Sequence, residues 1–131
     1  LFATTAAYRQ MGELEKEVSM FLPTANRSRI ADLAYLTAAQ VKEKNDLKPS
    51  ISDFVIEIIS KNYLADEIDA KLDEYFADGV KVVWQIFPKL KKVEVYTSPV
   101  SVTICRGTTI CAATPVLPDF NLKAEDLFVG Y

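Results

Sequence analysis

The acidic residue of greatest chemical interest in this sequence is Glu57, because it interrupts an apolar stretch from Ile51 to Ser60. In a strand, Glu57 shares one face with Val55 and Ile59, while the apolar side chains between them occupy the other face. A strand that is apolar on both faces is normally buried on each side. An unpaired carboxylate in such a strand would cost several kcal/mol or become protonated. We therefore expect Glu57 to have a partner, which could be a cation, a lysine or a hydrogen-bond network.

Two further ionisable residues occupy similarly apolar surroundings. Asp32 lies within a predicted strand, Arg29 to Leu36, where alternation places it on the face of Ile30, Ala34 and Leu36. Lys71 lies in a predicted helix, three residues after one apolar position and four before another, so it points along the edge of the core-facing stripe. A structural role is the alternative for all three residues. The acids could accept hydrogen bonds from backbone amides or form a buried ion pair with Lys71, and Lys71 could simply extend along the core to water.

Composition excludes several classes of protein. The 131 residues suffice for one domain, and 15 basic against 18 acidic residues give a net charge of −3. This charge weighs against tight non-specific binding of nucleic acid, although a local basic groove is compatible with it. The absence of histidine excludes histidine-based catalytic triads and histidine zinc sites. No apolar run approaches the roughly 20 residues of a membrane span, and no secretory signal is recognisable, so we expect a cytoplasmic protein outside the membrane.

The two cysteines, Cys105 and Cys111, flank a turn at Arg106-Gly107 and could face each other across a hairpin. They are too few and too widely spaced for a zinc ribbon. We expect both to be free, reduced thiols, as is usual in the cytosol. A thiol-redox function has little support, because no Cys-x-x-Cys pattern or charged activator accompanies them.

The elements that must position these residues alternate between strands and helices. Strands are expected at residues 14–22, 29–36, 53–59, 80–87 and 93–96, followed by a hairpin of 102–105 with 109–112. Helices are expected at 1–10, ended by Gly12, at 37–44, and at 64–78, ended by Gly79. A loop around Pro115 and Pro118 precedes a short segment at 123–128. The strand–helix–strand order of residues 53–87 is a βαβ unit, which implies a parallel strand pair with a right-handed crossover. The expected fold is therefore one mixed α/β domain with a central mixed sheet flanked by helices.

Other noticeable residues have simple structural interpretations. Asp53 is expected to be a turn or cap residue at the start of its strand, and Tyr75 and Trp84 are expected to belong to the core. The following basic side chains are expected to be solvated, where they could also meet phosphates: Arg27, Arg29, Lys89, Lys91 and Lys92.

Several motifs, in order along the chain, resemble the Uma family of restriction endonucleases, part of the PD-(D/E)XK nuclease superfamily. Residues 29–36, Arg-Ile-Ala-Asp-Leu-Ala-Tyr-Leu, are similar to its Arg-x-Pro-Asp strand, and residues 53–60 are similar to its Pro-Asp-Leu-Val-Val-Glu-Val-x-Ser strand. Residues 71–80 resemble its Lys-x-x-x-Tyr-x-x-x-Gly-Val pattern, Val83-Trp84 its Tyr-Trp pair, and residues 117–120 its Leu-Pro-Gly-Phe ending. The resemblance covers residues 12–128. It implies a restriction-endonuclease-like domain over residues 1–131 that lacks part of the N-terminal region.

The resemblance also implies a metal-dependent endonuclease that acts on DNA. By it, Asp32 and Glu57 would bind Mg²⁺ or Mn²⁺, hard cations that favour oxygen ligands. The metal ion would activate a water and neutralise charge on the scissile phosphate. The superfamily lysine usually follows the glutamate by two residues, where this sequence has Ile59. Lys71 resembles a relocated lysine, which would orient the water or stabilise the phosphorane charge.

The sequence departs from the family pattern in three respects. Ala31 and Ser52 stand where proline is usual, Phe87 replaces an aspartate between the retained Trp84 and Pro88, and the N-terminal region is largely absent. The departures at Phe87 and at the N-terminus, together with the acidic composition, support an alternative, in which the fold is a catalytically inactive module for protein interaction or homodimer formation. A basic rim around Asp32 and Glu57 would indicate a nuclease, whereas an extended apolar rim would indicate a protein partner.

Overall fold

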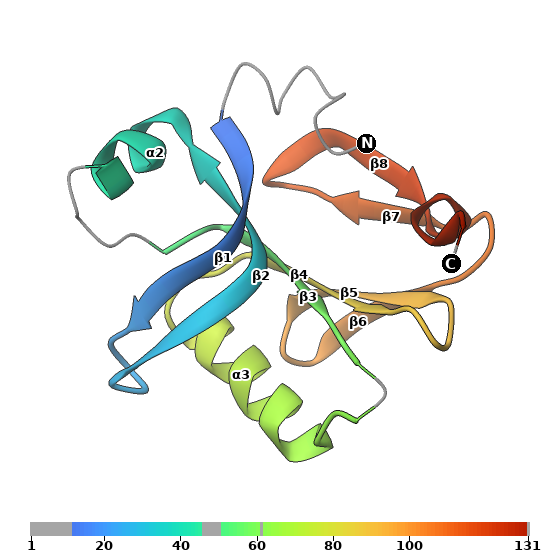
Figure 1. The fold of residues 1–131 in the computed structure, drawn as a ribbon, viewed down its shortest axis with the longest axis horizontal. Helices are drawn as coiled ribbons and strands as arrows, with labels where there is room; N and C mark the ends of the chain where they lie inside the picture. Colours follow the sequence, from blue (N-terminus) through green and yellow to red (C-terminus); the bar gives the residue numbers. More distant parts are fainter. Residues whose placement is uncertain (1–11, 46–50, 61, 131) are drawn as a thin grey trace.

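The computed structural model describes residues 12–45, 51–60 and 62–130 (Figure 1). The strands are β1 Gly12–Leu22, β2 Arg27–Thr37, β3 Phe54–Ile58, β4 Val82–Phe87, β5 Lys92–Ser98, β6 Ser101–Cys105, β7 Ile110–Ala113 and β8 Leu117–Lys123. The helices are α2 Ala38–Asn45, α3 Ala65–Ala77 and the 3₁₀ helix η2 Ala124–Phe128. The helix predicted over residues 1–10 lies outside the described residues. Within the described ranges, none of the helices is long and apolar enough to cross a membrane.

The first six strands form one sheet in chain order, β1-β2-β3-β4-β5-β6. Strands β3 and β4 are parallel, and every other neighbouring pair in this sheet is antiparallel. Helix α3 connects the parallel strands, as the sequence predicted for the βαβ unit. The periodic apolar residues of α3 end where Gly79 adopts a positive φ of 101°. The predicted fold class, a mixed α/β fold with a central mixed sheet, is therefore confirmed.

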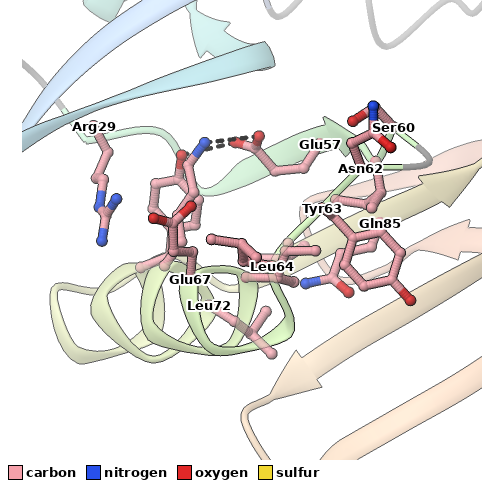
Figure 2. Close-up of a pocket in the computed structure, with 14 residues that line it drawn as sticks. Arg29, Glu57, Ser60, Asn62, Tyr63, Leu64, Glu67, Leu72 and Gln85 are labelled. Atoms are coloured by element: carbon pink, nitrogen blue, oxygen red, sulfur yellow. Dashed lines mark hydrogen bonds and ion pairs between the residues drawn. The ribbon is translucent and has the colours of Figure 1, made fainter.

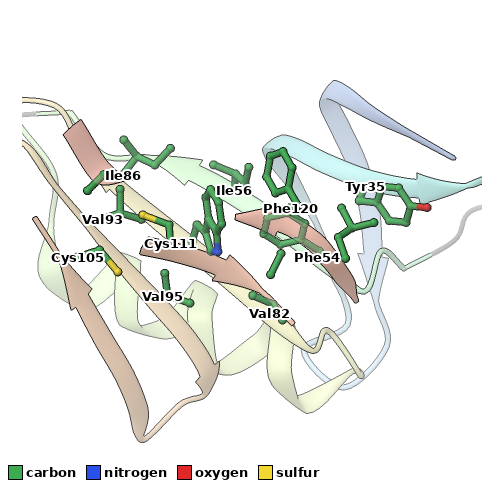
Figure 3. Close-up of a cluster of buried hydrophobic side chains, with 14 of the residues drawn as sticks. Tyr35, Phe54, Ile56, Val82, Ile86, Val93, Val95, Cys105, Cys111 and Phe120 are labelled. Atoms are coloured by element: carbon green, nitrogen blue, oxygen red, sulfur yellow. The ribbon is translucent and has the colours of Figure 1, made fainter. Parts of the chain in front are cut away.

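Strand β3 is buried on both faces, as the apolar residues on either side of Glu57 predicted. Phe54 and Ile56 belong to one core cluster, which extends to Trp84 and to the second sheet formed by β7 and β8 (Figure 3). Val55 belongs to a second cluster that includes residues of α3. The large sheet therefore lies between α3 on one face and the β7–β8 sheet on the other (Figure 1). In this arrangement the side chains of β3 are buried from solvent except at the C-terminal end of the strand.

The predicted hairpin of residues 102–105 with 109–112 is wrong. Strand β6 pairs with β5 as the last strand of the large sheet, whereas β7 pairs with β8 in the separate sheet. The indole of Trp84 donates a hydrogen bond to Ala112 O at 2.9 Å, which holds β7 across the face of β4. Both thiols are buried and free, and burial raises the pKa of Cys111 to about 12. Since a thiol reacts as the thiolate, this supports no thiol chemistry at Cys111.

Two further expectations are corrected in this structure. Residues 117–123 form β8, where a loop was expected around Pro118. The β7–β8 register shifts beside Pro118. Because proline has no backbone N–H to donate, it is tolerated where regular pairing is interrupted in this way. Gly12 was expected to end a helix, but it begins β1, where a Cβ atom would collide with the carbonyl of Leu36.

Ser52 connects β3 to the end of β2 through its side chain. Its side chain is fully buried, and its hydroxyl lies 2.6 Å from Tyr35 O and 2.7 Å from Phe54 O. The same oxygen accepts a hydrogen bond from Phe54 N at 3.1 Å. The serine hydroxyl therefore satisfies backbone groups that would otherwise be buried without partners.

Replacing Ser52 with alanine should lower the free energy of unfolding by about 1–3 kcal/mol, because backbone groups at the β2–β3 junction would lose their partner. Chemical denaturation of the variant measures this loss. The matched control is Ser19→Ala, at an exposed position of β1, which should leave stability within about 0.5 kcal/mol of the parent. Equal stability of Ser52→Ala and Ser19→Ala would contradict the role assigned to the Ser52 hydroxyl.

Candidate active site

The candidate site lies where β2 and β3 separate. Their last paired residues are Leu33 and Ile56, so the backbone ladder ends one residue before Glu57. Beyond this point the backbone groups of β2 and β3 form hydrogen bonds with side chains, one from β2 and one from α3. Asp32 Oδ2 accepts a hydrogen bond from Ile58 N at 2.7 Å, and Lys71 Nζ donates to Ile30 O at 2.9 Å.

The strand alternation used to place Asp32 does not hold across this residue. Ala31 and Ala34 are three residues apart, yet both belong to the core cluster on the α3 face, while Ile30 is 59% exposed. Opposite Asp32 lies Glu17, which has a positive φ of 52°, and these two residues are missing from an otherwise continuous β1–β2 register. The strand pair therefore changes direction at Asp32, which frees its carboxylate to reach β3.

Glu57 lies at the centre of the site, on the face of β3 that is covered by α3 (Figure 2). Its Oε2 atom is 2.8 Å from Lys71 Nζ, and its Oε1 atom accepts a hydrogen bond from the Tyr75 hydroxyl at 2.8 Å. Lys71 and Tyr75 are four residues apart on α3, one helical turn, so both reach the same carboxylate. The expectation that Glu57 has a partner is confirmed, and of the alternatives considered the structure shows a lysine together with a tyrosine hydroxyl.

The electrostatic environment of Glu57 opposes its ionisation. Burial raises the pKa of Glu57, and the nearby carboxylate of Asp32 adds to the increase. The hydrogen bond and charge of Lys71 and the hydrogen bond of Tyr75 act in the opposite direction without cancelling the effect of burial. Burial also raises the pKa of Tyr75, so its hydroxyl remains protonated and donates to Glu57. The site thus holds a carboxylate whose charge its surroundings only partly compensate.

A cavity of about 430 Å³ opens onto Glu57. Lys71 and Gln85 also line it, and Gln85 is the register partner of Glu57 on β4, with 4% exposure. Arg29 and Tyr63 lie at opposite ends of this cavity (Figure 2). Asp32 does not line the cavity; it adjoins it through the hydrogen bond to the β3 backbone. The structure therefore brings Glu57 and Lys71 into direct contact and places Asp32 beside them.

Two of the basic side chains expected to be solvated are not. Arg29 has 20% side-chain exposure and binds Glu74 of α3 through two hydrogen bonds, of 2.9 and 2.8 Å. This guanidinium lowers the pKa of Glu74. Lys92 has 16% side-chain exposure, pairs with Glu94 at 2.6 Å and lies over the ring of Phe87. Burying the aliphatic parts of these side chains against apolar neighbours explains both departures.

Sequence reasoning missed two residues of the site, Tyr75 and Gln85. Tyr75 was assigned to the core, and it is indeed fully buried, but its hydroxyl binds Glu57. Its position four residues after Lys71 was the signal for this contact. Gln85 is a polar residue in a strand whose six residues are all buried. This is the same type of signal that identified Glu57.

Tyr75→Phe should raise the pKa of Glu57 further, because the hydrogen bond that it removes lowers that pKa. Stabilisation by Mn²⁺, if it requires ionised Glu57, would then appear at higher pH than in the parent. The variant should also lose about 1–2 kcal/mol of unfolding free energy. Thermal unfolding with and without Mn²⁺ across a pH series measures both effects. The control is Tyr96→Phe, which removes a similar bond to Glu94 outside the cavity and should leave the pH dependence unchanged.

Comparisons with known proteins show the family and the fold of this chain. A family model for Uma2, described as "Putative restriction endonuclease", matches residues 5–125. The chain belongs to the Uma2 family. Among solved structures it is similar to a putative nuclease of DUF820 from Anabaena variabilis, with a TM-score of 0.81 and 14% identity over 98% of this chain and 74% of that chain. At this identity the likeness shows a shared fold. A search of curated proteins finds no match.

The donor atoms of this Uma2 protein suit a hard divalent cation. The Oδ1 atom of Asp32 is not used in the hydrogen bond to Ile58, whereas both oxygens of Glu57 already bind Lys71 or Tyr75 and each has one further lone pair for a cation. Within the described ranges, no group of three or more histidine, cysteine, aspartate or glutamate side chains could hold a metal ion. A cation at this position would therefore rest on two carboxylates, with water or phosphate oxygens as its other ligands. That arrangement is common for Mg²⁺.

Proposed function

We propose that this Uma2 protein is a divalent-metal-dependent endonuclease that hydrolyses phosphodiester bonds in DNA. In this proposal Asp32 and Glu57 bind Mg²⁺ or Mn²⁺, and Lys71 is the catalytic lysine. The observation that carries it is that Asp32, Glu57 and Lys71, from three separate elements, meet where β2 and β3 separate, beside a cavity of about 430 Å³ that Glu57 and Lys71 line. Membership of the Uma2 family supports the same reaction class.

The fixed positions of the three side chains suit phosphodiester hydrolysis. Ile58 N holds the Asp32 carboxylate, and the Tyr75 hydroxyl holds the carboxylate of Glu57. The Lys71 ammonium has three protons, of which the Glu57 and Ile30 contacts use two. The third proton can bind a phosphate oxygen and stabilise the charge that develops on it. A bound metal ion supplies a water of lowered pKa and neutralises phosphate charge.

The charge around the cavity is mixed. Arg29 and Lys71 contribute positive charge, whereas Glu57 and Glu67 contribute negative charge. The rim is thus neither the basic surface expected of a nuclease nor the apolar surface expected of a protein partner. A metal ion held by Asp32 and Glu57 would offset their two negative charges and leave Lys71 to attract phosphate, while Arg29 stays paired with Glu74. This is consistent with a site that binds DNA only when it is loaded with metal.

The proposal is tested by metal-dependent stabilisation and cleavage. Binding of Mg²⁺ or Mn²⁺ to the folded state alone raises the unfolding midpoint by mass action. We expect such a rise, together with cleavage of supercoiled plasmid DNA that EDTA abolishes. The absence of both would instead support a non-catalytic interaction module, in which Lys71 and Tyr75 neutralise a structural Glu57.

A further inference from the structure

The two edge strands of the large sheet differ in how they are protected. The first edge, β1, carries Glu13, Glu15, Lys16 and Glu17. Its backbone is also distorted at Glu17, where φ is 52°. Charged side chains and local distortions of this kind prevent an edge strand from pairing with another chain. Strand β1 is therefore protected against sheet extension.

The opposite edge, β6, has neither form of protection. Its sequence, Ser-Val-Thr-Ile-Cys, contains no charged residue and no proline, and residues Ser101 to Ile104 are all exposed. The apolar side chains of Val102 and Ile104 are 46% and 53% exposed. In the described part of the chain β6 pairs with β5 alone, so the backbone groups on its outer side form no strand ladder. An exposed, β-branched, uncharged edge is a template for strand addition.

We propose that β6 pairs antiparallel with β6 of a second copy of this chain, which joins the two six-stranded sheets into one continuous sheet across a two-fold axis. A two-fold axis perpendicular to the sheet keeps each side chain on its own face, and residues directly opposite each other must share a face. The axis must therefore pass through a residue position rather than between two residues. Centring it on Thr103, the middle residue of β6, aligns all five residues with their counterparts.

A second copy is favoured over another peptide because β6 is self-complementary in this register. Val102 lies opposite Ile104 of the second copy, and Thr103 lies opposite its own counterpart. Pairs of β-branched side chains and pairs of threonines are both favourable across antiparallel strands. No like charges oppose each other, since β6 has none. Val102 and Ile104 of each copy then form a group of four adjacent apolar side chains on one face of the joined sheet, next to Tyr96 and Glu94, their register partners in β5.

The interface is separate from the candidate active site. Strands β4 and β5 lie between β6 and β3, which carries Glu57 (Figure 1). Dimer formation is therefore independent of the proposed nuclease activity, and either proposal can fail without the other. The paired strands are only five residues long, which places the contact among small interfaces. We expect a dimer that dissociates on dilution through the micromolar range.

Sedimentation velocity over a concentration series tests the association. The parent should shift from monomer to dimer as concentration rises, and Thr103→Lys, which places two lysines opposite each other, should remain monomeric. The matched control is Ser19→Lys on the other edge strand, which should dimerise like the parent. A parent that stays monomeric at high concentration overturns the proposal, as does a Thr103→Lys variant that dimerises normally.

Crosslinking tests the register without depending on the behaviour of the lysine variant. Thr103→Cys places two thiols directly opposite each other, so mild oxidation with glutathione disulfide should form a covalent dimer. Val102→Cys lies opposite Ile104 of the second copy and should crosslink at least tenfold less. The native Cys105 and Cys111 are buried, and the parent serves as their control. A Thr103→Cys variant that forms no covalent dimer, or no more than Val102→Cys, contradicts the proposed register.

Discussion

Glu57→Gln is expected to abolish metal-dependent DNA cleavage, with a loss of about a thousandfold or more, equivalent to roughly 4 kcal/mol. The substitution keeps the shape of the side chain and an acceptor oxygen for Lys71, while the new amide group can donate to the Tyr75 hydroxyl oxygen in place of the bond that Tyr75 donates to Glu57. It removes the negative charge that the proposed metal ion requires. Plasmid cleavage in Mn²⁺ measures the loss. The control is Asp53→Asn, in the residue just before β3 and outside the cavity, which should retain full activity.

The same variant should lose the thermal response to metal. At a concentration of about 100 times Kd, a metal ion adds about 2.7 kcal/mol to the unfolding free energy of the parent. For a chain of this size that raises the midpoint by roughly 10 °C. Glu57→Gln should show no such rise. A variant that still cleaves DNA, or whose midpoint still rises with Mn²⁺, would exclude Glu57 as a ligand.

Without metal, Glu57→Gln is expected to be at least as stable as the parent. Because burial raises the pKa of Glu57 in the folded protein, the folded state holds this proton to higher pH than the unfolded state. The contribution of Glu57 to stability is therefore greatest below its unfolded pKa and declines as pH rises through its folded pKa. Above that range the ionised carboxylate is a net cost, which glutamine removes. Comparison of the two midpoints at neutral pH and at pH 4 measures the difference.

Lys71→Met should reduce cleavage about a hundredfold while leaving the metal-induced rise in the unfolding midpoint in place. Methionine retains the apolar contacts along α3 but removes the ammonium group that would stabilise charge on the phosphate. It also leaves Glu57 without its ion-pair partner, which makes a metal ion the only remaining counter-charge. Parallel measurements of cleavage and thermal unfolding separate the catalytic role of Lys71 from that of the metal ligands.

Lys81→Met is the matched control for Lys71→Met, because Lys81 pairs with Asp53 outside the cavity. It should retain parental activity. If Lys71→Met cleaved DNA as fast as Lys81→Met, Lys71 would be a structural partner of Glu57 alone. If it lost the metal response as well, Lys71 would be needed to assemble the site rather than for catalysis.

The sequence by itself determined the elements that carry the site. The apolar residues on both sides of Glu57 predicted a strand buried on both faces, and β3 has that position between α3 and the second sheet. The 3.6-residue periodicity that ends at Gly79 predicted α3, and with it the direction of Lys71. Both patterns are local, since periodicity and stop signals are read within one segment. The cost of burying a lone carboxylate predicted that Glu57 has a partner, and a pair with Lys71 was one of the alternatives.

Only the tertiary structure decided which segments meet. Strands β6 and β7 were expected to pair with each other, but β6 pairs with β5 and β7 pairs with β8. The hydrogen bond that holds β7 across β4 joins Trp84 to Ala112, which are far apart in sequence. The reach of Asp32 to Ile58 depends on the kink opposite Glu17, which strict alternation does not predict. Tyr75 belongs both to the core and to the site because its ring and its hydroxyl meet different neighbours. Each outcome depends on where a second chain segment lies, and no pattern within a single segment contains that information.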